Sequence, residues 1–234
     1  KDGVSTDGTL DIIQQYASKH ENVVWKSEPD KGIYDALNQG YTMSTGDIIG
    51  VCNDLFTTPD AVSKFVRAIK DGGNDCMGVH SDLVYATDEK IIRYWKMGQG
   101  KITQGWMPGH PTLYLKREVY EKYGLYDDTL KIVSDWKWFV QAVVFSAEEV
   151  YYIPMDVTIF DMTGISETNL AAREKERRME LEKMFPMAVL RDYDAYHFPI
   201  NQIQRLKRHH SWPLVYFMER ILFKLEKWGL LREK

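Results

Sequence analysis

The sequence predicts an α/β protein, with a mixed sheet flanked by helices and a helical C-terminal extension. In the first half of the chain, short apolar runs alternate with segments whose apolar residues recur at helical spacing, as in repeated strand–turn–helix units. After Asp75 the strand-like runs are joined by short turns, which favours antiparallel pairing. From Ser166 the sequence is charged and has helical periodicity. We therefore expect a sheet domain over residues 1–165 and a helical extension over 166–234.

The segment before Asp75 contains the signals for helices and strands in alternation. The turn "DGVSTDGT" leads into a first helix, "NVVWKSE" is a short strand, and "PDKGIYDALNQGYTMSTG" carries a second helix. The run "DIIGVC" is apolar on both faces, which predicts a strand in the middle of a parallel sheet covered on both sides. Thr58 and Pro59 begin a third helix, whose apolar stripe continues to Gly72.

The segment after Asp75 contains antiparallel strands and further helices. The runs "CMGVHSDLVYAT" and "KIIRYWKM" are joined by the turn "TDEK", and "PTLYLKREVYEKYG" is a strand that passes into a short helix. Ser134 marks the start of the helix "SDWKWFVQAVVFSA", and "EEVYYIPMDVTIF" is another strand. The last predicted helix extends from Pro213 to about Leu231.

Composition and charge limit the classes of function. The 234 residues are 44% hydrophobic and 27% charged, as in an ordinary globular protein, with a net charge of -4. Such a chain lacks the basic surface that phosphate neutralisation requires, so we expect no nucleic-acid partner. Cys52 and Cys76 stand in no CxxC or Cys/His array, which indicates neither a zinc site nor a disulfide framework. A reducing, cytoplasmic setting fits this cysteine content best. No run approaches the roughly 18 to 20 apolar residues that span a membrane.

Three polar clusters stand at or near the expected carboxyl ends of strands: "KDGVSTDGT", "SEPDKGIYDALN" and "CND". In open α/β sheets, ligands bind beyond these strand ends. Each cluster also has an explanation without a ligand, because Asp, Asn, Gly and Ser are common turn formers. Their recurrence at three such positions favours a ligand site.

Taken in order, these clusters resemble the motifs of the inverting family 2 glycosyltransferases, which have the GT-A fold. "DGVSTDGTLDII" is similar to the family's DGGSTDGT turn, and "SEPDKGIYDALNQGYTMSTGDIIGVCND" to the stretch that ends at its metal-binding acidic motif. "GHPTLYLKREVYEKYGLYDDTLKIVSDWKWF" is similar to the segment that holds its catalytic base. The resemblance covers most of Asp2 to Phe139. It implies a metal-dependent hexosyltransferase with a nucleotide-sugar donor.

The resemblance assigns the donor and metal sites to particular residues. Asp2 stands where the family contacts the nucleoside, and Asp54 where it binds a divalent cation, Mg²⁺ or Mn²⁺. Such a cation neutralises charge that develops on the leaving diphosphate, and it prefers oxygen ligands. The family's usual acidic pair is replaced here by Asn53 and Asp54, and Asn53 offers a carbonyl oxygen to the donor without a charge. We expect this replacement to affect metal affinity.

Asp135, in "VSDWKWF", matches the position of the family's general base. Inversion in a single displacement needs a base that removes the proton of the acceptor hydroxyl. A helix start favours the ionised carboxylate that a base requires. Ser134 and Asp135 are also common residues at helix starts, so a purely structural role stays open. Lys137 occupies the position where the family often has a second acidic residue, which we expect to alter the acceptor side.

The remaining candidates belong to the donor and acceptor sides. Asp30, Lys31 and Gly32 precede a helix, where backbone N–H groups and a lysine can face the donor, although a solvated loop is nearly as simple an interpretation. His110, in "PGHPT", lies at the matching place between the donor and acceptor subsites. Trp106 can offer an apolar face to a sugar ring. A single histidine is more often structural and tryptophan more often lies in a core, so these alternatives stay open.

The C-terminal segment combines basic charge with an amphipathic helix. Residues 203–234 carry a net charge of +5, against -9 for the residues before them. One face of the predicted helix is apolar, with Leu214, Phe217, Met218, Ile221, Leu222, Leu225 and Trp228. This profile is typical of a helix at a membrane surface, here the inner face. Docking of the helix on its own domain, or self-association with a second copy, is the alternative.

These observations predict an inverting glycosyltransferase that moves a sugar from a nucleotide-sugar to a glycan or lipid-linked acceptor in cell-surface polysaccharide biosynthesis. The alternative is a non-catalytic nucleotide-sugar-binding or assembly module derived from such an enzyme, which Asn53 and Lys137 favour. A dinucleotide enzyme is disfavoured because no GxGxxG follows a strand. The chain starts at the turn after the family's first strand–helix–strand unit, so we expect this unit to be missing from the sequence.

Overall fold

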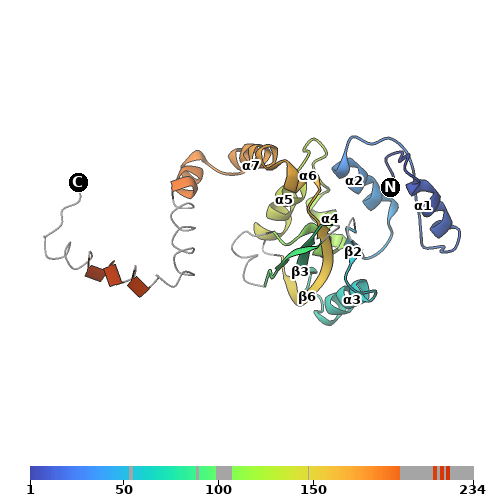
Figure 1. Cartoon of the computed structure of the whole chain (residues 1–234), viewed down its shortest axis with the longest axis horizontal. Coiled ribbons are helices and arrows are strands. Elements are labelled where there is room, and N and C mark those ends of the chain that lie inside the picture. Colours follow the sequence, from blue (N-terminus) through green and yellow to red (C-terminus); the bar gives the residue numbers. More distant parts are fainter. Residues whose placement is uncertain are drawn as a thin grey trace. The chain divides into compact units, whose positions relative to one another are not determined.

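The computed structural model describes residues 1–52, 55–87, 90–98, 107–146 and 148–195, together with 213–214, 217–218 and 220–221. The chain divides into two compact units, Lys1–Arg177 and Arg178–Lys234 (Figure 1). The first unit contains the sheet and all the predicted site residues. The domain boundary expected between residues 165 and 166 stays a prediction.

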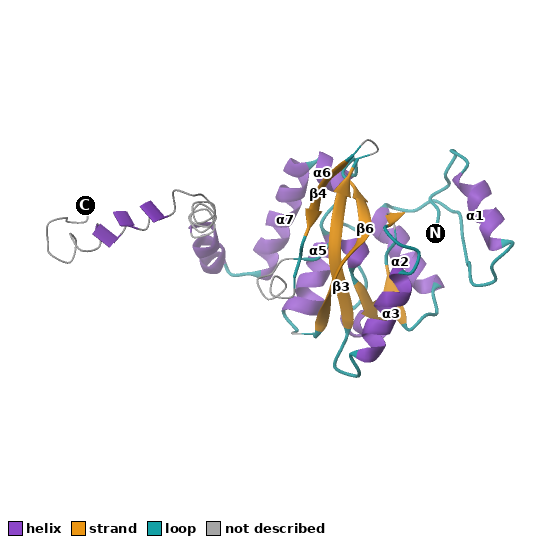
Figure 2. Cartoon of the chain, turned by 60° about the horizontal axis from the view of Figure 1, so that its bottom comes forward, coloured by secondary structure: helices purple, strands orange, loops and turns teal. Residues whose placement is uncertain are grey.

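A mixed sheet forms the centre of the first unit (Figures 1 and 2). Its described strands are β1 (Ile48–Gly50), β2 (Leu55–Phe56), β3 (Gly78–Ala86), β4 (Ile91–Trp95), β5 (Tyr114–Lys116) and β6 (Val150–Asp161). The strand order is β1-β5-β3-β6-β2, and β4 pairs with β3. β3 and β6 are parallel, whereas the other described pairs are antiparallel. The predicted mixed sheet is therefore confirmed.

Helices cover both faces of this sheet. They are α1 (Thr9–Ala17), α2 (Ile33–Met43), α3 (Ala61–Asp71), α4 (Arg117–Tyr123), α5 (Ser134–Phe139), α6 (Ile165–Thr168) and α7 (Leu170–Met184), with the short helices η2 (His110–Thr112) and η3 (Val140–Val144). Neighbouring residues of a strand point to opposite faces. On β5, Tyr114 stacks on Phe65 of α3 with ring centroids 4.4 Å apart. Leu115 instead packs in a cluster with residues of α2, α4 and α5. The predicted flanking helices are therefore confirmed.

Two strands differ from the sequence prediction. The run "DIIGVC" is expected to be a central parallel strand, but β1 pairs antiparallel with β5 and ends the strand order among the described strands. Its Ile48 and Ile49 are only half-buried. An apolar run indicates a strand but not its neighbours, because pairing depends on residues far away in the sequence. Likewise, "NVVWKSE" forms no strand and contributes only a bridge between Ser27 and Asp2.

The predicted C-terminal helix, Pro213 to about Leu231, lies largely outside the described residues. The described apolar residues of this segment are exposed: Leu214, Phe217, Met218 and Ile221. Among the helices that the structure describes, none has the length and apolar character needed to cross a membrane.

Candidate active site

Asp135 lies in the first turn of α5, and one oxygen of its carboxylate is held in place. The backbone N–H of Trp136 donates to Asp135 Oδ1 at 2.8 Å, and the Tyr34 hydroxyl lies 2.9 Å from the same oxygen. This hydroxyl also lies 2.6 Å from the carbonyl oxygen of Ile132. Burial and, after it, the charge of Asp135 raise the pKa of Tyr34, so the hydroxyl keeps its proton and acts as a donor.

The other oxygen of the Asp135 carboxylate faces His110. His110 is the first residue of η2, and its Nδ1 lies 3.8 Å from Asp135 Oδ2. Its Nε2 lies 2.8 Å from the Tyr126 hydroxyl, which in turn lies 3.1 Å from the Tyr120 hydroxyl. Burial raises the pKa of Tyr126 well above its ordinary value. The contact with Tyr126 therefore orients the imidazole so that Nδ1 is directed toward the carboxylate.

Helix α2 connects the predicted donor side to this cluster. Lys31 and Gly32 come directly before α2, and Tyr34 is its second residue. Gly32 has a φ of 134°, a conformation that favours glycine. Further along α2, the Asn38 side chain bonds to both backbone groups of Tyr126, at 3.0 and 2.8 Å. One helix thus fixes the tyrosine that holds Asp135 and the tyrosine that holds His110.

The Asp30 carboxylate is bound by other groups of the chain, whereas the Lys31 side chain is largely exposed. Asp30 Oδ1 accepts the backbone N–H of Gly32 at 3.1 Å, and its Oδ2 lies 3.2 Å from Lys1 Nζ. The Lys31 side chain is 75% exposed, with its Nζ 3.4 Å from Asp128 Oδ2. Asp30 therefore stabilises the turn before α2, whereas the Lys31 ammonium is accessible to an anion in solution.

Both oxygens of the Asp2 carboxylate accept hydrogen bonds from neighbouring groups of the chain. The Ser27 hydroxyl donates to Oδ2 at 2.6 Å, and the backbone N–H groups of Val4 and Ser5 donate to the same oxygen at 2.9 and 3.1 Å. The Ser5 hydroxyl donates to Oδ1. These hydrogen bonds, above all the one from Ser27, lower the pKa of Asp2 to about 2. Asp2 therefore fastens the first loop to Ser27, and its contact with a nucleoside stays a prediction.

Three predicted site residues, Asn53, Asp54 and Trp106, lie outside the described residues. Within the described ranges, no group of three or more His, Cys, Asp or Glu side chains is arranged to hold a metal ion. The assignment of the cation to Asp54 stays a prediction. One carboxylate is chemically compatible with Mg²⁺ or Mn²⁺, because phosphate oxygens and waters can complete the coordination shell.

Lys137 forms an ion pair close to the start of α5. Its Nζ lies 2.6 Å from Asp127 Oδ2, and this contact is the main reason why the pKa of Asp127 falls to about 2. The position that is often acidic in the family therefore carries a cation here, and a neighbouring carboxylate balances its charge.

Sequence reasoning missed Tyr34 and Tyr126, which hold Asp135 and His110. Tyr34 is separated from Asp135 by 101 positions, so no local pattern connects the two residues. The only available signal was general: a buried tyrosine hydroxyl needs a hydrogen-bond partner.

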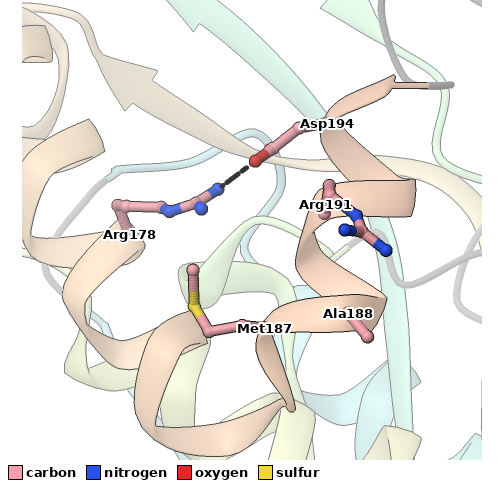
Figure 3. Close-up of a pocket in the computed structure, with 5 residues that line it drawn as sticks. All are labelled: Arg178, Met187, Ala188, Arg191 and Asp194. Carbon is pink, nitrogen blue, oxygen red and sulfur yellow. Dashed lines mark hydrogen bonds and ion pairs between the residues drawn. The ribbon is translucent and has the colours of Figure 1, made fainter.

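A separate pocket lies within the second unit (Figure 3). It has a volume of about 360 Å³ and is lined by Arg178, Met187, Ala188, Arg191 and Asp194. Arg178 Nη1 pairs with Asp194 at 2.8 Å. None of the predicted site residues lines this pocket, so the candidate active site is the cluster of Tyr34, His110, Tyr126 and Asp135.

Comparison with known proteins connects this cluster to one family. The family model described as "Glycosyl transferase family 2" matches residues 1–135. An uncharacterized glycosyltransferase of Mycobacterium tuberculosis is 26% identical over 204 residues, which cover 81% of this chain and 75% of that protein. A PGL/p-HBAD biosynthesis glycosyltransferase of Mycobacterium bovis is 24% identical over 192 residues, which cover 77% of this chain and 71% of that protein.

Solved structures are similar over a smaller part of their length. The mannosyltransferase PcManGT from Pyrobaculum calidifontis, in complex with GDP-Man and Mn²⁺, has a TM-score of 0.48 and 17% identity. TarS of S. aureus has a TM-score of 0.48 and 14% identity. In each comparison 68% of this chain is covered, together with 46% of PcManGT and 49% of TarS. The chain thus spans about half the length of these structures.

Proposed function

The chain belongs to glycosyl transferase family 2, and on that premise we propose that it is an inverting hexosyltransferase with Asp135 as general base. The observation that carries this proposal is the asymmetry of the Asp135 carboxylate. Oδ1 is held by the Tyr34 hydroxyl and the Trp136 N–H, whereas no described residue donates a hydrogen bond to Oδ2. A carboxylate with one oxygen fixed and the other available is suited to accept a proton.

In the proposed reaction, Asp135 Oδ2 takes the proton of an acceptor hydroxyl. The hydroxyl oxygen then forms a bond to the anomeric carbon of the donor, on the face opposite the leaving group. The bond between that carbon and the diphosphate oxygen breaks, and its electron pair stays on the nucleoside diphosphate. The Tyr34 hydroxyl and the Trp136 N–H keep the carboxylate in position. His110, 3.8 Å from Oδ2, borders the space in which the acceptor hydroxyl would lie.

The donor is proposed to bind beside the start of α2 and at the residues after β1. Lys31 supplies an accessible ammonium for the diphosphate. Gly32 stays a donor-side candidate by its position, since its backbone N–H donates to Asp30 Oδ1. Asp2, Asp30 and Asn53 are the further donor-side candidates. Asp54 would hold Mg²⁺ or Mn²⁺, which supplies neutralisation of the charge on the leaving diphosphate. Calorimetry of UDP and GDP binding, with and without Mn²⁺, tests this assignment. A nucleotide affinity that does not change when Mn²⁺ is added would count against Asp54.

The acceptor is proposed to be a glycan or a lipid-linked glycan of cell-surface polysaccharide biosynthesis. One relative is named for PGL/p-HBAD biosynthesis, which supports a biosynthetic glycosyl transfer by this chain as well. The basic C-terminal segment is proposed to contact the inner face of the membrane, with self-association as its alternative. Co-sedimentation with anionic vesicles distinguishes them: replacing Leu214, Phe217 and Ile221 by serine should release the chain, and unchanged sedimentation would favour self-association.

The central test is Asp135→Asn, assayed with a panel of nucleotide-sugars. Asn keeps the shape of the side chain but cannot take the proton, so we expect kcat to fall by about 10³-fold. Binding of UDP or GDP should survive. The matched control is Asp71→Asn, which makes the same change of charge at the exposed end of α3.

Three outcomes would contradict the proposal. Transfer at the wild-type rate by Asp135→Asn would remove the residue from catalysis. Loss of nucleotide binding together with transfer would show that it supports the fold or the donor site. Nucleotide binding by the wild-type chain without any transfer would favour the non-catalytic module.

A further inference from the structure

Glu176 of α7 binds the segment that leads directly to Asp135. Its Oε1 accepts the backbone N–H of Lys131 at 2.7 Å. Its Oε2 accepts the backbone N–H groups of Ile132 and Val133, at 2.7 and 3.0 Å. Three successive N–H groups therefore converge on one carboxylate, 43 to 45 positions away in the sequence. Hydrogen bonds to an ionised acceptor are stronger than those between neutral groups, so this contact restrains the segment firmly.

Two further contacts join α7 to the same segment. The guanidinium carbon of Arg177 lies 4.6 Å from the centroid of the Trp136 ring, within the range of a cation–π interaction. Ala172 packs against the apolar cluster of Leu130, Ile132 and Val133. The first part of α7 therefore holds the chain on both sides of Ser134 and Asp135.

Ile132 connects the Glu176 contact to the catalytic carboxylate. Its N–H donates to Glu176, and its carbonyl oxygen lies 2.6 Å from the Tyr34 hydroxyl. That hydroxyl also holds Asp135 Oδ1 at 2.9 Å. The Tyr34 hydroxyl shares its proton between the Ile132 carbonyl oxygen and Asp135 Oδ1. A displacement of Ile132 would therefore change how strongly this hydroxyl binds Asp135 and, with it, the orientation of the carboxylate.

We propose that Glu176 is a positioning residue for Asp135: by binding the N–H groups of residues 131–133, it sets the direction of Asp135 Oδ2. This inference rests on the proposed function of Asp135 as the base. Glu176 lies outside residues 1–135, which match the family, so the C-terminal part of the chain contributes to the geometry of the reaction.

The test compares Glu176→Gln with Glu174→Gln in the full chain. The amide introduced by Glu176→Gln would present an N–H₂ group to backbone donors and lose at least one of the three bonds. We expect kcat to fall about tenfold while KM for the donor changes less than about twofold, because the donor contacts lie elsewhere. Glu174→Gln makes the same change of charge on the same helix, but the Glu174 side chain is 60% exposed, so this variant is expected to leave kcat unchanged. Equal kcat values for the two variants would overturn the proposal.

A double variant separates positioning from general support of the fold. In the Asp135→Asn background the base is absent, so Glu176→Gln should leave the residual transfer unchanged within about twofold. A second tenfold loss in that background would show that Glu176 acts through something other than Asp135, and would overturn the proposal. Failure of the proposed function is a different result, namely equal transfer by the wild-type chain and Asp135→Asn.

A readout that does not need activity completes the design. The ring resonances of His110, measured by NMR, report the position of the Asp135 carboxylate 3.8 Å away. They should shift in Glu176→Gln and not in Glu174→Gln. If Glu176→Gln does not fold, Glu176→Asp, which keeps the charge and shortens the side chain, takes its place, and the same resonances are expected to shift relative to the wild type. Unchanged His110 resonances in a folded Glu176 variant would contradict the inference.

Discussion

Asp2 and Asp135 are two carboxylates of the first unit in opposite situations. Asp2 is 6% exposed, and both of its oxygens accept hydrogen bonds from hydroxyl or backbone N–H groups. The Asp135 side chain is 24% exposed, and only its Oδ1 receives hydrogen bonds from the described residues. Its Oδ2 faces His110 across 3.8 Å.

This difference separates an acid that stabilises the fold from an acid that can react. A carboxylate that is fully hydrogen-bonded must break existing bonds before it accepts a proton, so its interactions favour the ionised folded form. Asp135 Oδ2 accepts no such bond from any residue that the structure describes. The sequence motifs point to both residues alike, and the hydrogen bonds are what distinguish them.

Asp2→Asn is expected to have the largest effect on stability. The amide has one acceptor oxygen and no charge. It therefore weakens the bonds from Ser27, Val4 and Ser5 to Oδ2 and cannot accept the Ser5 hydroxyl at the position of Oδ1. We expect Tm to fall by about 5 °C, while kcat at saturating donor stays within about twofold of the wild type. Thermal unfolding and steady-state kinetics measure the two quantities, with Asp71→Asn as control. A raised donor KM at unchanged Tm would instead assign Asp2 to the nucleoside site and break the contrast with Asp135.

Tyr34→Phe tests the support of the other carboxylate, Asp135. We expect it to change kcat, with a smaller effect on stability than Asp2→Asn. The change removes the hydroxyl that holds Asp135 Oδ1 and keeps the ring in its buried place. Loss of one hydrogen bond to a charged group is expected to lower kcat about tenfold, with little change in KM. Tyr41→Phe is the matched control, because it removes a hydroxyl from the same helix. Equal kcat values in the two variants would mean that Oδ1 needs no support from Tyr34.

The parts of the fold that were predicted correctly have local signals. Ser134 begins α5 as expected, and α2 and α3 occupy their predicted segments, because starts, stops and apolar spacing lie within a few residues of one another. The antiparallel pair of β3 and β4 follows from the short turn between them. The neighbour of β1 was not predictable in this way, since β5 lies more than 60 positions further along the chain.

The candidate site was predictable as separate residues but not as a network. Motif positions led to Asp135 and His110 individually, and the structure brings them together. Tyr34 was missed because "GIYDALN" presents it as one more apolar residue of a helix. Glu176 was missed because it stands in a charged helix where many glutamates are simply solvated. Roles that depend on which groups meet after folding leave no trace in local patterns.

Acid pH is expected to cause the smallest change in stability. Comparing the wild type with Asp2→Asn at acid pH separates the contribution of Asp2 from that of other titratable groups. Burial lowers the pKa of His80 to about 4, so the folded state keeps this ring neutral while the unfolded state binds a proton below about 6.5. Stability should therefore decline as the pH falls from about 6.5 to 4, equally in the wild type and in Asp2→Asn. The pKa of Asp2 is lowered from 3.8 to about 2, so its contribution is complete above about pH 4 and is lost as the pH falls toward 2. The difference in Tm between the two proteins should be constant from pH 7 to about 4 and shrink below it. A difference that persists at pH 2 would mean that the shape of the Asp2 side chain, rather than its charge, fastens the loop.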